Sequence, residues 1–144
     1  MQSPSFNQLE CKISAQSSQK YTDGLWVNFS IQSKYDKPVM LLTWQTPLEG
    51  IMGDLFVVKD EAGNVLTYQG PMIKRSAPTE SDFISLEPNK SAINKVNLSL
   101  VYQLQAGKTY HLNLKDRLFN IIDSEQKQQF VRCDISDEIL VSLE

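Results

Sequence analysis

Apolar and polar residues alternate with a period of two through most of this chain, the pattern of strands that bury one face. The alternation is clearest at residues 25–31 and recurs at 9–15, 91–98 and 139–143. Residues 39–45 are nearly all apolar, which predicts a central strand covered on both faces. No segment sustains a period of 3.6 residues, so we predict an all-β fold.

Turn signals between these runs favour a sandwich. Residues 60–64, DEAGN, interrupt the apolar stretch 55–68 and predict a β-hairpin. Gly107 and Tyr110 match the tyrosine corner of immunoglobulin-like sandwiches, although Tyr110 could also be an ordinary strand aromatic. We predict an immunoglobulin-like antiparallel β-sandwich of about seven to nine strands, with the first and last alternating runs as edge strands.

The length and the charge of the chain limit the classes of function that are possible. The 144 residues suit one domain, residues 1–144, with 1–8 as a flexible N-terminal tail. The formal net charge is −3, and no basic cluster exceeds the pair Lys74 and Arg75. This balance excludes nucleic acid as a partner. No apolar run reaches the roughly 18 residues that a membrane span needs. The first residues lack a signal-peptide pattern, as expected of a mature secreted chain or of a cytosolic one.

Cys11 and Cys133 lie near opposite ends of the chain, at a spacing that fits no metal motif. Both flank predicted strands, and chain ends in compact domains often lie close together. We expect a disulfide, which indicates an oxidising compartment and thus a secreted or periplasmic protein. The alternative is a pair of buried free thiols.

Catalytic chemistry is sparse in this sequence. His111 is the one histidine, and the motifs HExxH, GxSxG and GxGxxG are absent. Glu49 and Asp54 share a loop, but a pair of glycosidase carboxylates needs a deep cleft. Both could instead hold the loop through backbone hydrogen bonds. We expect no metal, no cofactor and no enzymatic activity, with a small hydrolase as the alternative.

The most unusual segment is the loop at residues 43–56, TWQTPLEGIMGDLF, which is more apolar than solubility requires. It is either a protein-binding tip or a plug that folds over the open end of the sandwich. Trp44 extends the most apolar run, which favours a core position, although Trp is also enriched in interface hot spots. The binding interpretation assigns as site residues Trp44, Pro47, Leu48, Glu49, Met52 and Asp54, together with Lys74 and Arg75.

Eight short motifs occur one after another along the chain. They are GLWVNFSI at 24–31, KPV at 37–39, WQTPLEG at 44–50, GDLF at 53–56, YQGP at 68–71, KR at 74–75, PT at 78–79 and LEP at 86–88. This series resembles the β-rich region before the catalytic domain of deuterolysin-like and peptidyl-Lys zinc metallopeptidases. The resemblance covers roughly residues 9–115, and TPLEG followed by GD is its most specific part.

The resemblance implies a stand-alone relative of a non-catalytic domain. In that family the region looks like a pro-segment that assists or restrains the zinc domain. Residues 116–144 lie outside the resemblance, and no catalytic residue of the family has a counterpart here. We therefore expect a secreted or periplasmic protein-binding module, acting as a protease inhibitor or a chaperone, with a metallopeptidase as its protein partner. The alternative is a purely structural sandwich.

Overall fold

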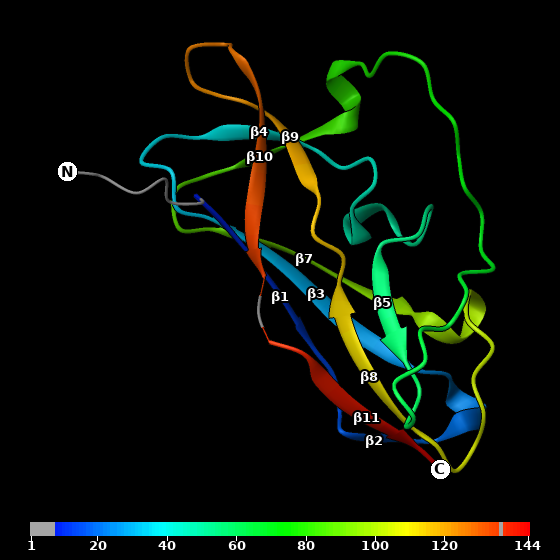
Figure 1. The fold of residues 1–144 in the computed structure, drawn as a ribbon. Helices are drawn as coiled ribbons and strands as arrows, with labels where there is room; N and C mark the ends of the chain where they lie inside the picture. Colours follow the sequence, from blue (N-terminus) through cyan, green and yellow to red (C-terminus); the bar gives the residue numbers. More distant parts are fainter. Residues whose placement is uncertain (1–7, 136) are drawn as a thin grey trace.

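The computed structural model describes residues 8–135 and 137–144 and consists mainly of strands (Figure 1). The strands are β1 (Leu9–Ser14), β2 (Ser18–Gln19), β3 (Trp26–Ser33), β4 (Val39–Leu42), β5 (Phe56–Lys59), β6 (Phe83–Leu86), β7 (Ser91–Asn97), β8 (Thr109–Leu114), β9 (Leu118–Ile122), β10 (Gln128–Ile135) and β11 (Ile139–Leu143). Short 3₁₀ turns form at η1 (Tyr21–Asp23), η2 (Pro47–Glu49), η3 (Glu80–Asp82) and η4 (Leu98–Leu100). Among the described residues, no helix is long and apolar enough to cross a membrane.

The strands form two sheets around one core, which confirms the predicted all-β sandwich. The larger sheet has the order β6-β4-β9-β10-β1-β3-β7, and the smaller has β2-β11-β8-β5. The described residues thus form eleven strands, more than the seven to nine predicted. One reason is that β2 has only two residues, too few to show a periodic pattern.

Alternation along the strands builds the core. In β3 the side chains of Val27, Phe29 and Ile31 are completely buried, whereas Trp26 and Asn28 on the opposite face are exposed. Similar alternation in β1, β5, β8 and β11 adds their inward side chains to the same cluster. Each fully buried side chain of this size contributes about 1.5–3 kcal/mol of transfer free energy.

The sandwich is not wholly antiparallel as predicted. β1 pairs in parallel with β10, and β11 pairs in parallel with β2. As a result β1 lies between β10 and β3, and β11 lies between β2 and β8, so the prediction that they are edge strands was wrong. Alternation shows which face of a strand is buried, but it carries no information about the neighbouring strands.

The turn predicted at DEAGN forms, but the second strand of its hairpin does not. Asp60 Oδ1 accepts the N–H groups of Ala62 and Asn64 and closes the turn. Beyond it, Val65 makes a single bridge to Lys59. The Leu66 N–H still donates to the carbonyl of Val58 on β5 at 2.8 Å, but the chain then leaves β5, and the Gln69 N–H donates to the carbonyl of Val101 instead. The chain then runs along the side of the sandwich to η3 (Figure 1).

The predicted N-terminal tail, residues 1–8, lies outside the described residues except for Gln8. Gln8 is tethered, because its carbonyl accepts the Lys34 N–H at 2.7 Å. Of the predicted tail, the structure therefore describes this one residue.

Cys11 and Cys133 form a disulfide with their Cα atoms 5.7 Å apart. It joins the neighbouring strands β1 and β10, where Leu9 is the residue opposite Cys133. Both cysteines are buried, so the bond lies within the apolar core. The predicted link between the first strand and the C-terminal region is therefore present.

Tyr110 forms the predicted tyrosine corner. Its side chain is buried in β8, and its hydroxyl accepts the backbone N–H of Gln105 at 2.8 Å. This is a hydrogen bond to the chain a few residues upstream, as in immunoglobulin-like sandwiches. It satisfies a backbone donor in the connection that leads into β8.

Loss of the disulfide is predicted to destabilise the sandwich strongly. The bond closes a loop with a sequence separation of 122 residues, which corresponds to about 5 kcal/mol in the chain-entropy account. We expect reduction, or the double substitution Cys11→Ala/Cys133→Ala, to lower the free energy of unfolding in urea by about this amount. A change below about 1 kcal/mol would contradict the prediction.

Candidate functional site

The loop at residues 43–56 contains a short turn with complete caps. Thr46 precedes η2, and its Oγ1 accepts the Leu48 N–H. Pro47 occupies the first position of η2, where its fixed φ suits the turn and no N–H is needed. Gly50 ends the turn with φ 95°, a conformation that other residues rarely adopt. The motif TPLEG is therefore the sequence of a capped 3₁₀ turn.

The same turn is fastened to the far edge of the larger sheet. The Asn94 amide, on β7, donates to the carbonyls of Pro47 and Leu48 at 2.9 and 3.3 Å. Pro47 is buried, and the half-buried side chains of Leu48 and Ile51 pack against the core. This arrangement favours the plug interpretation for the inner part of the loop.

Arg75 holds the outer side of the loop through Glu49 and Trp44. Its Nη1 lies 2.7 Å from Glu49 Oε1, an ion pair outside straight hydrogen-bond geometry. Its guanidinium carbon lies 4.8 Å from the ring centroid of Trp44. The other oxygen of Glu49 accepts the Gln45 N–H at 2.8 Å, and Gln45 has φ 61°. Trp44 is half-buried at this rim and not in the core, where its apolar run had placed it.

Asp82, at the end of η3, completes this set of contacts. Its carboxylate accepts the Thr79 N–H at 2.8 Å. This hydrogen bond, with smaller contributions from the Trp44 indole N–H and the charge of Arg75, holds the pKa of Asp82 below its ordinary value. We call Trp44, Glu49, Arg75 and Asp82 the rim cluster.

Asp54 belongs to a different set of contacts. Its Oδ2 lies 2.7 Å from Lys115 Nζ, and its Oδ1 is 3.4 Å from the hydroxyl of Tyr102. Burial and the charge of Asp54 raise the pKa of Tyr102 well above its ordinary value. Tyr102 also donates to the carbonyl of Phe56. Asp54 and Glu49 therefore pair with different cations, Lys115 and Arg75.

Four residues next to the rim cluster form a ridge in which Met52 is half-buried and the other three are exposed. Met72 is 73% exposed and Ile73 is 41% exposed. The Ile73 N–H donates to the Met52 carbonyl at 3.3 Å, which places Met52 beside them. Lys74 is exposed. We call Met52, Met72, Ile73 and Lys74 the outer ridge.

The structure thus separates the eight predicted site residues. Trp44, Glu49 and Arg75 join in the rim cluster, whereas Met52 and Lys74 lie on the outer ridge. The remaining three, Pro47, Leu48 and Asp54, serve packing or a separate ion pair. Sequence reasoning missed Met72 and Ile73, and the available signal was two large apolar residues after Pro71 in a predicted loop.

Residues 8–135 and 137–144 contain no group of three or more His, Cys, Asp or Glu side chains that could hold a metal ion. His111 lies on β8 with its Nδ1 2.8 Å from Glu138 Oε1. This exposed pair involves β8 of the smaller sheet and is separate from the rim cluster.

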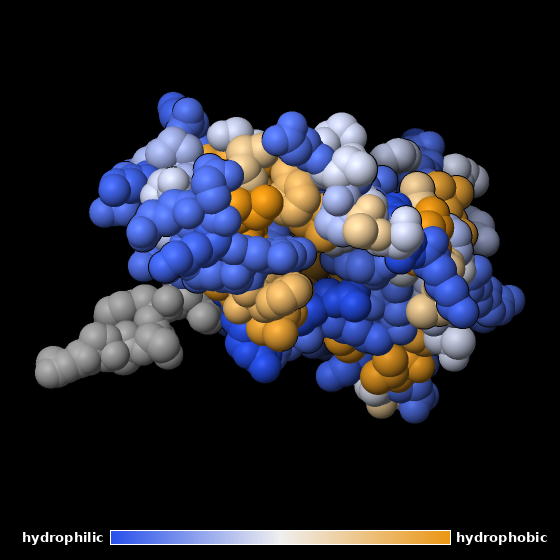
Figure 2. All heavy atoms as spheres, turned by 90° about the horizontal axis from the view of Figure 1, so that it is seen from above, coloured by the Kyte–Doolittle hydropathy of each residue, from blue (hydrophilic) through white to orange (hydrophobic). Residues whose placement is uncertain are grey.

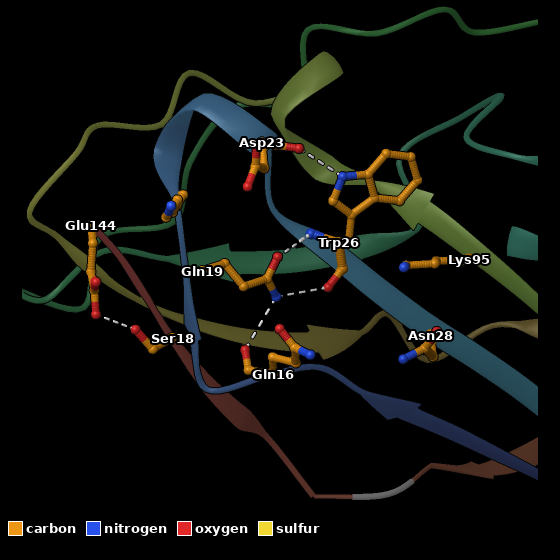
Figure 3. A pocket seen from close by; sticks show the side chains of 9 residues that line it. Gln16, Ser18, Gln19, Asp23, Trp26, Asn28, Lys95 and Glu144 are labelled. Atoms are coloured by element: carbon orange, nitrogen blue, oxygen red, sulfur yellow. Dashed lines mark hydrogen bonds between the residues drawn. The ribbon is translucent and has the colours of Figure 1, made fainter.

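A hollow of about 520 Å³ lies around the exposed Trp26 (Figure 3). Gln16, Lys20, Asp23, Asn28, Lys95 and Glu144 are among the side chains that line it. We call it the Trp26 hollow. Sequence reasoning missed it, although Trp26 occupies the polar phase of the clearest alternating run, where a Trp is unexpected.

Comparisons with known proteins give one partial relative. No family model matches the chain. Over 91 residues, or 63% of its length, the chain is 33% identical to an extracellular protease from Aeromonas hydrophila. The chain covers 26% of that relative's length. It is therefore similar to one part of a protease chain.

Glu49→Gln is predicted to destabilise the loop. Glu49 and Arg75 have side chains only 14% and 20% exposed, so loss of one charge leaves the other largely buried and unpaired. We expect a decrease of about 2 kcal/mol in the free energy of unfolding, between the values for exposed and fully buried pairs. Glu10→Gln, which breaks the exposed pair with Lys34, is the matched control and should cost less than about 0.5 kcal/mol. Equal effects of the two substitutions would refute this account.

Asp82→Asn is predicted to flatten the acid side of the stability profile. Because the folded-state pKa of Asp82 is lowered, its carboxylate stabilises the fold above the ordinary pKa. That contribution is lost as the pH falls below about 4. Urea unfolding of both proteins between about pH 7 and 3 should show a smaller loss of stability on acidification for the variant. Parallel profiles would show that Asp82 contributes nothing.

Proposed function

We propose that this chain is a non-catalytic, protease-associated module that binds a peptidase in a secreted or periplasmic setting. The observation that carries the proposal is the similarity to one quarter of an extracellular protease. The Cys11–Cys133 disulfide supports an oxidising compartment. The motif series that resembles the pro-region of deuterolysin-like and peptidyl-Lys enzymes supports a zinc metallopeptidase as the partner, with this chain as its inhibitor or chaperone.

The outer ridge suits contact with a peptidase. Peptidases bind extended backbone in a cleft, and residues 70–78 are irregular, without helix or strand. Exposed Met72 and Ile73 offer apolar contacts, and Lys74 offers a charge. On the face drawn in Figure 2, apolar side chains gather in separate patches among polar ones, a composition usual in non-obligate interfaces.

The ridge is held at both ends, which favours binding without a large ordering cost. On one side, the Tyr68 hydroxyl donates to the Pro71 carbonyl. A side chain at Gly70 would place its Cβ 2.4 Å from Val101, so this close approach needs glycine. On the other side, Arg75 is fixed by the rim cluster. We infer that the ridge binds as a preformed segment and blocks the cleft of the peptidase.

A purely structural role remains the second candidate. Burial of Pro47 and the packing of Leu48 and Ile51 against the core support it for the inner loop. The two functions make different predictions for the outer ridge, because a structural loop needs no exposed apolar side chains there.

The ridge is predicted to be required for peptidase binding. The extracellular protease of Aeromonas hydrophila should be titrated with the chain while cleavage of a fluorogenic peptide is followed. We expect inhibition at micromolar or lower concentration. The double substitution Met72→Ala/Ile73→Ala should weaken it at least about tenfold, because exposed apolar anchors are lost.

The matched control for this experiment is Ile93→Ala/Leu118→Ala. These side chains are 70% and 56% exposed and lie on β7 and β9, outside the ridge. The control should inhibit as the unchanged protein does. Failure to inhibit, together with no complex by interferometry at about 10 µM, would overturn the proposed function. If both double variants still inhibit, the proposed function stands, but the outer ridge is not the contact surface.

A further inference from the structure

The Trp26 hollow has one aromatic wall, and several contacts fix it in place. The indole Nε1 of Trp26 donates to the Asp23 carbonyl at 2.7 Å. The Gln19 side chain accepts the Trp26 N–H at 2.8 Å and donates to its carbonyl at 3.0 Å. Figure 3 shows these contacts on one side of the ring, with Lys95 and Asn28 nearby. Trp26 as a residue is 37% exposed, and Lys95 Nζ lies over its ring.

The polar side chains of the hollow have spare hydrogen-bonding capacity. Within the part of the chain that the structure describes, the Asn28 amide and the Lys20 ammonium have no partner. Lys95 Nζ lies 5.3 Å from the Trp26 ring centroid, held by a cation–π contact and free to donate elsewhere. Glu144 accepts the Ser18 hydroxyl and keeps a second oxygen. The hollow therefore offers both donors and acceptors next to an aromatic face.

The charges of the hollow balance, which restricts the ligand class. Lys20 and Lys95 offset Asp23 and Glu144, so neither an anion nor a cation gains a net attraction. A neutral ligand with many hydroxyl groups matches the donors and acceptors. The apolar face of a pyranose ring matches the Trp26 indole, and the volume lies within the range of small-molecule sites.

We propose that the Trp26 hollow is a binding site for a neutral saccharide, with Trp26 as the stacking platform. Asn28, Lys95 and Lys20 donate hydrogen bonds to the sugar hydroxyls, and the Asp23 carboxylate accepts them. The site is distinct from the outer ridge, because it lies at β3 and η1 rather than at residues 70–78. A saccharide site of this kind would hold the module on a glycan surface while the ridge engages a protein.

The test is an NMR titration of the two indole N–H signals, which come from Trp26 and Trp44. The probes are cellotetraose, chitotetraose, maltotetraose and mannotetraose, each added to about 10 mM. We expect at least one of them to shift the Trp26 signal, with a Kd of about 0.1–1 mM, and to leave Trp44 unchanged. If none of the four shifts the Trp26 signal, the proposal is overturned.

Variants locate the binding and separate it from general effects. Trp26→Ala should weaken binding by calorimetry at least about tenfold, whereas Phe130→Ala, which removes another exposed aromatic on β10, should leave it unchanged. Asn28→Ala removes only an exposed side chain, so this variant should fold. It provides the test of the site if Trp26→Ala does not fold. Unchanged affinity in Asn28→Ala and in any folded Trp26→Ala protein overturns the proposal. Tighter binding of a sulfated heparin tetrasaccharide also overturns it, because the lysines would then dominate.

Discussion

The parallel pairing of β1 with β10 is the junction on which the larger sheet depends. The order β6-β4-β9-β10-β1-β3-β7 leaves this pair as the link between a four-strand half and a three-strand half. Its register covers only three residue pairs, from Leu9 opposite Cys133 to Cys11 opposite Ile135. The disulfide lies within these pairs, so a short junction gains a covalent bond. β1 can pair early with β3, which follows it closely in sequence, but its pairing with β10 must wait until nearly the whole chain has been made. Long-range pairing of this kind folds slowly.

The loop at residues 43–56 provides the second link between the two halves. It leaves β4 in one half and is hydrogen-bonded by Asn94 on β7, the outer strand of the other half. The capped turn TPLEG and the buried Pro47 make this crossing compact. A segment that crosses the sheet in this way is constrained by packing, which accounts for the distinctive composition of its inner part.

The sequence predicts features that depend on local periodicity or on a few rare residues. Most strands follow from alternation, and the disulfide follows from two cysteines near strand ends. Contacts between distant segments are different. Nothing in the spacing of Glu49 and Arg75, or of Asp54 and Lys115, indicates which acid meets which base. The strand neighbours and the Trp26 hollow depend on the same kind of long-range information.

Sequence reasoning left open whether Trp44, Glu49 and Arg75 bind a partner or stabilise the loop. In the structure they contact each other in the rim cluster. Trp44, Glu49 and Arg75 interact with each other, so they have little surface left for a partner. Under the proposed function, their contribution to binding would be to hold Lys74 and its neighbours in one arrangement. Because ordering a free loop costs binding free energy for each side chain that it immobilises, a cluster that orders the ridge during folding favours a peptidase contact. Under the proposed function, binding by the segment 70–78 and closure by the loop 43–56 would both depend on the contacts of the rim cluster, which joins the two segments.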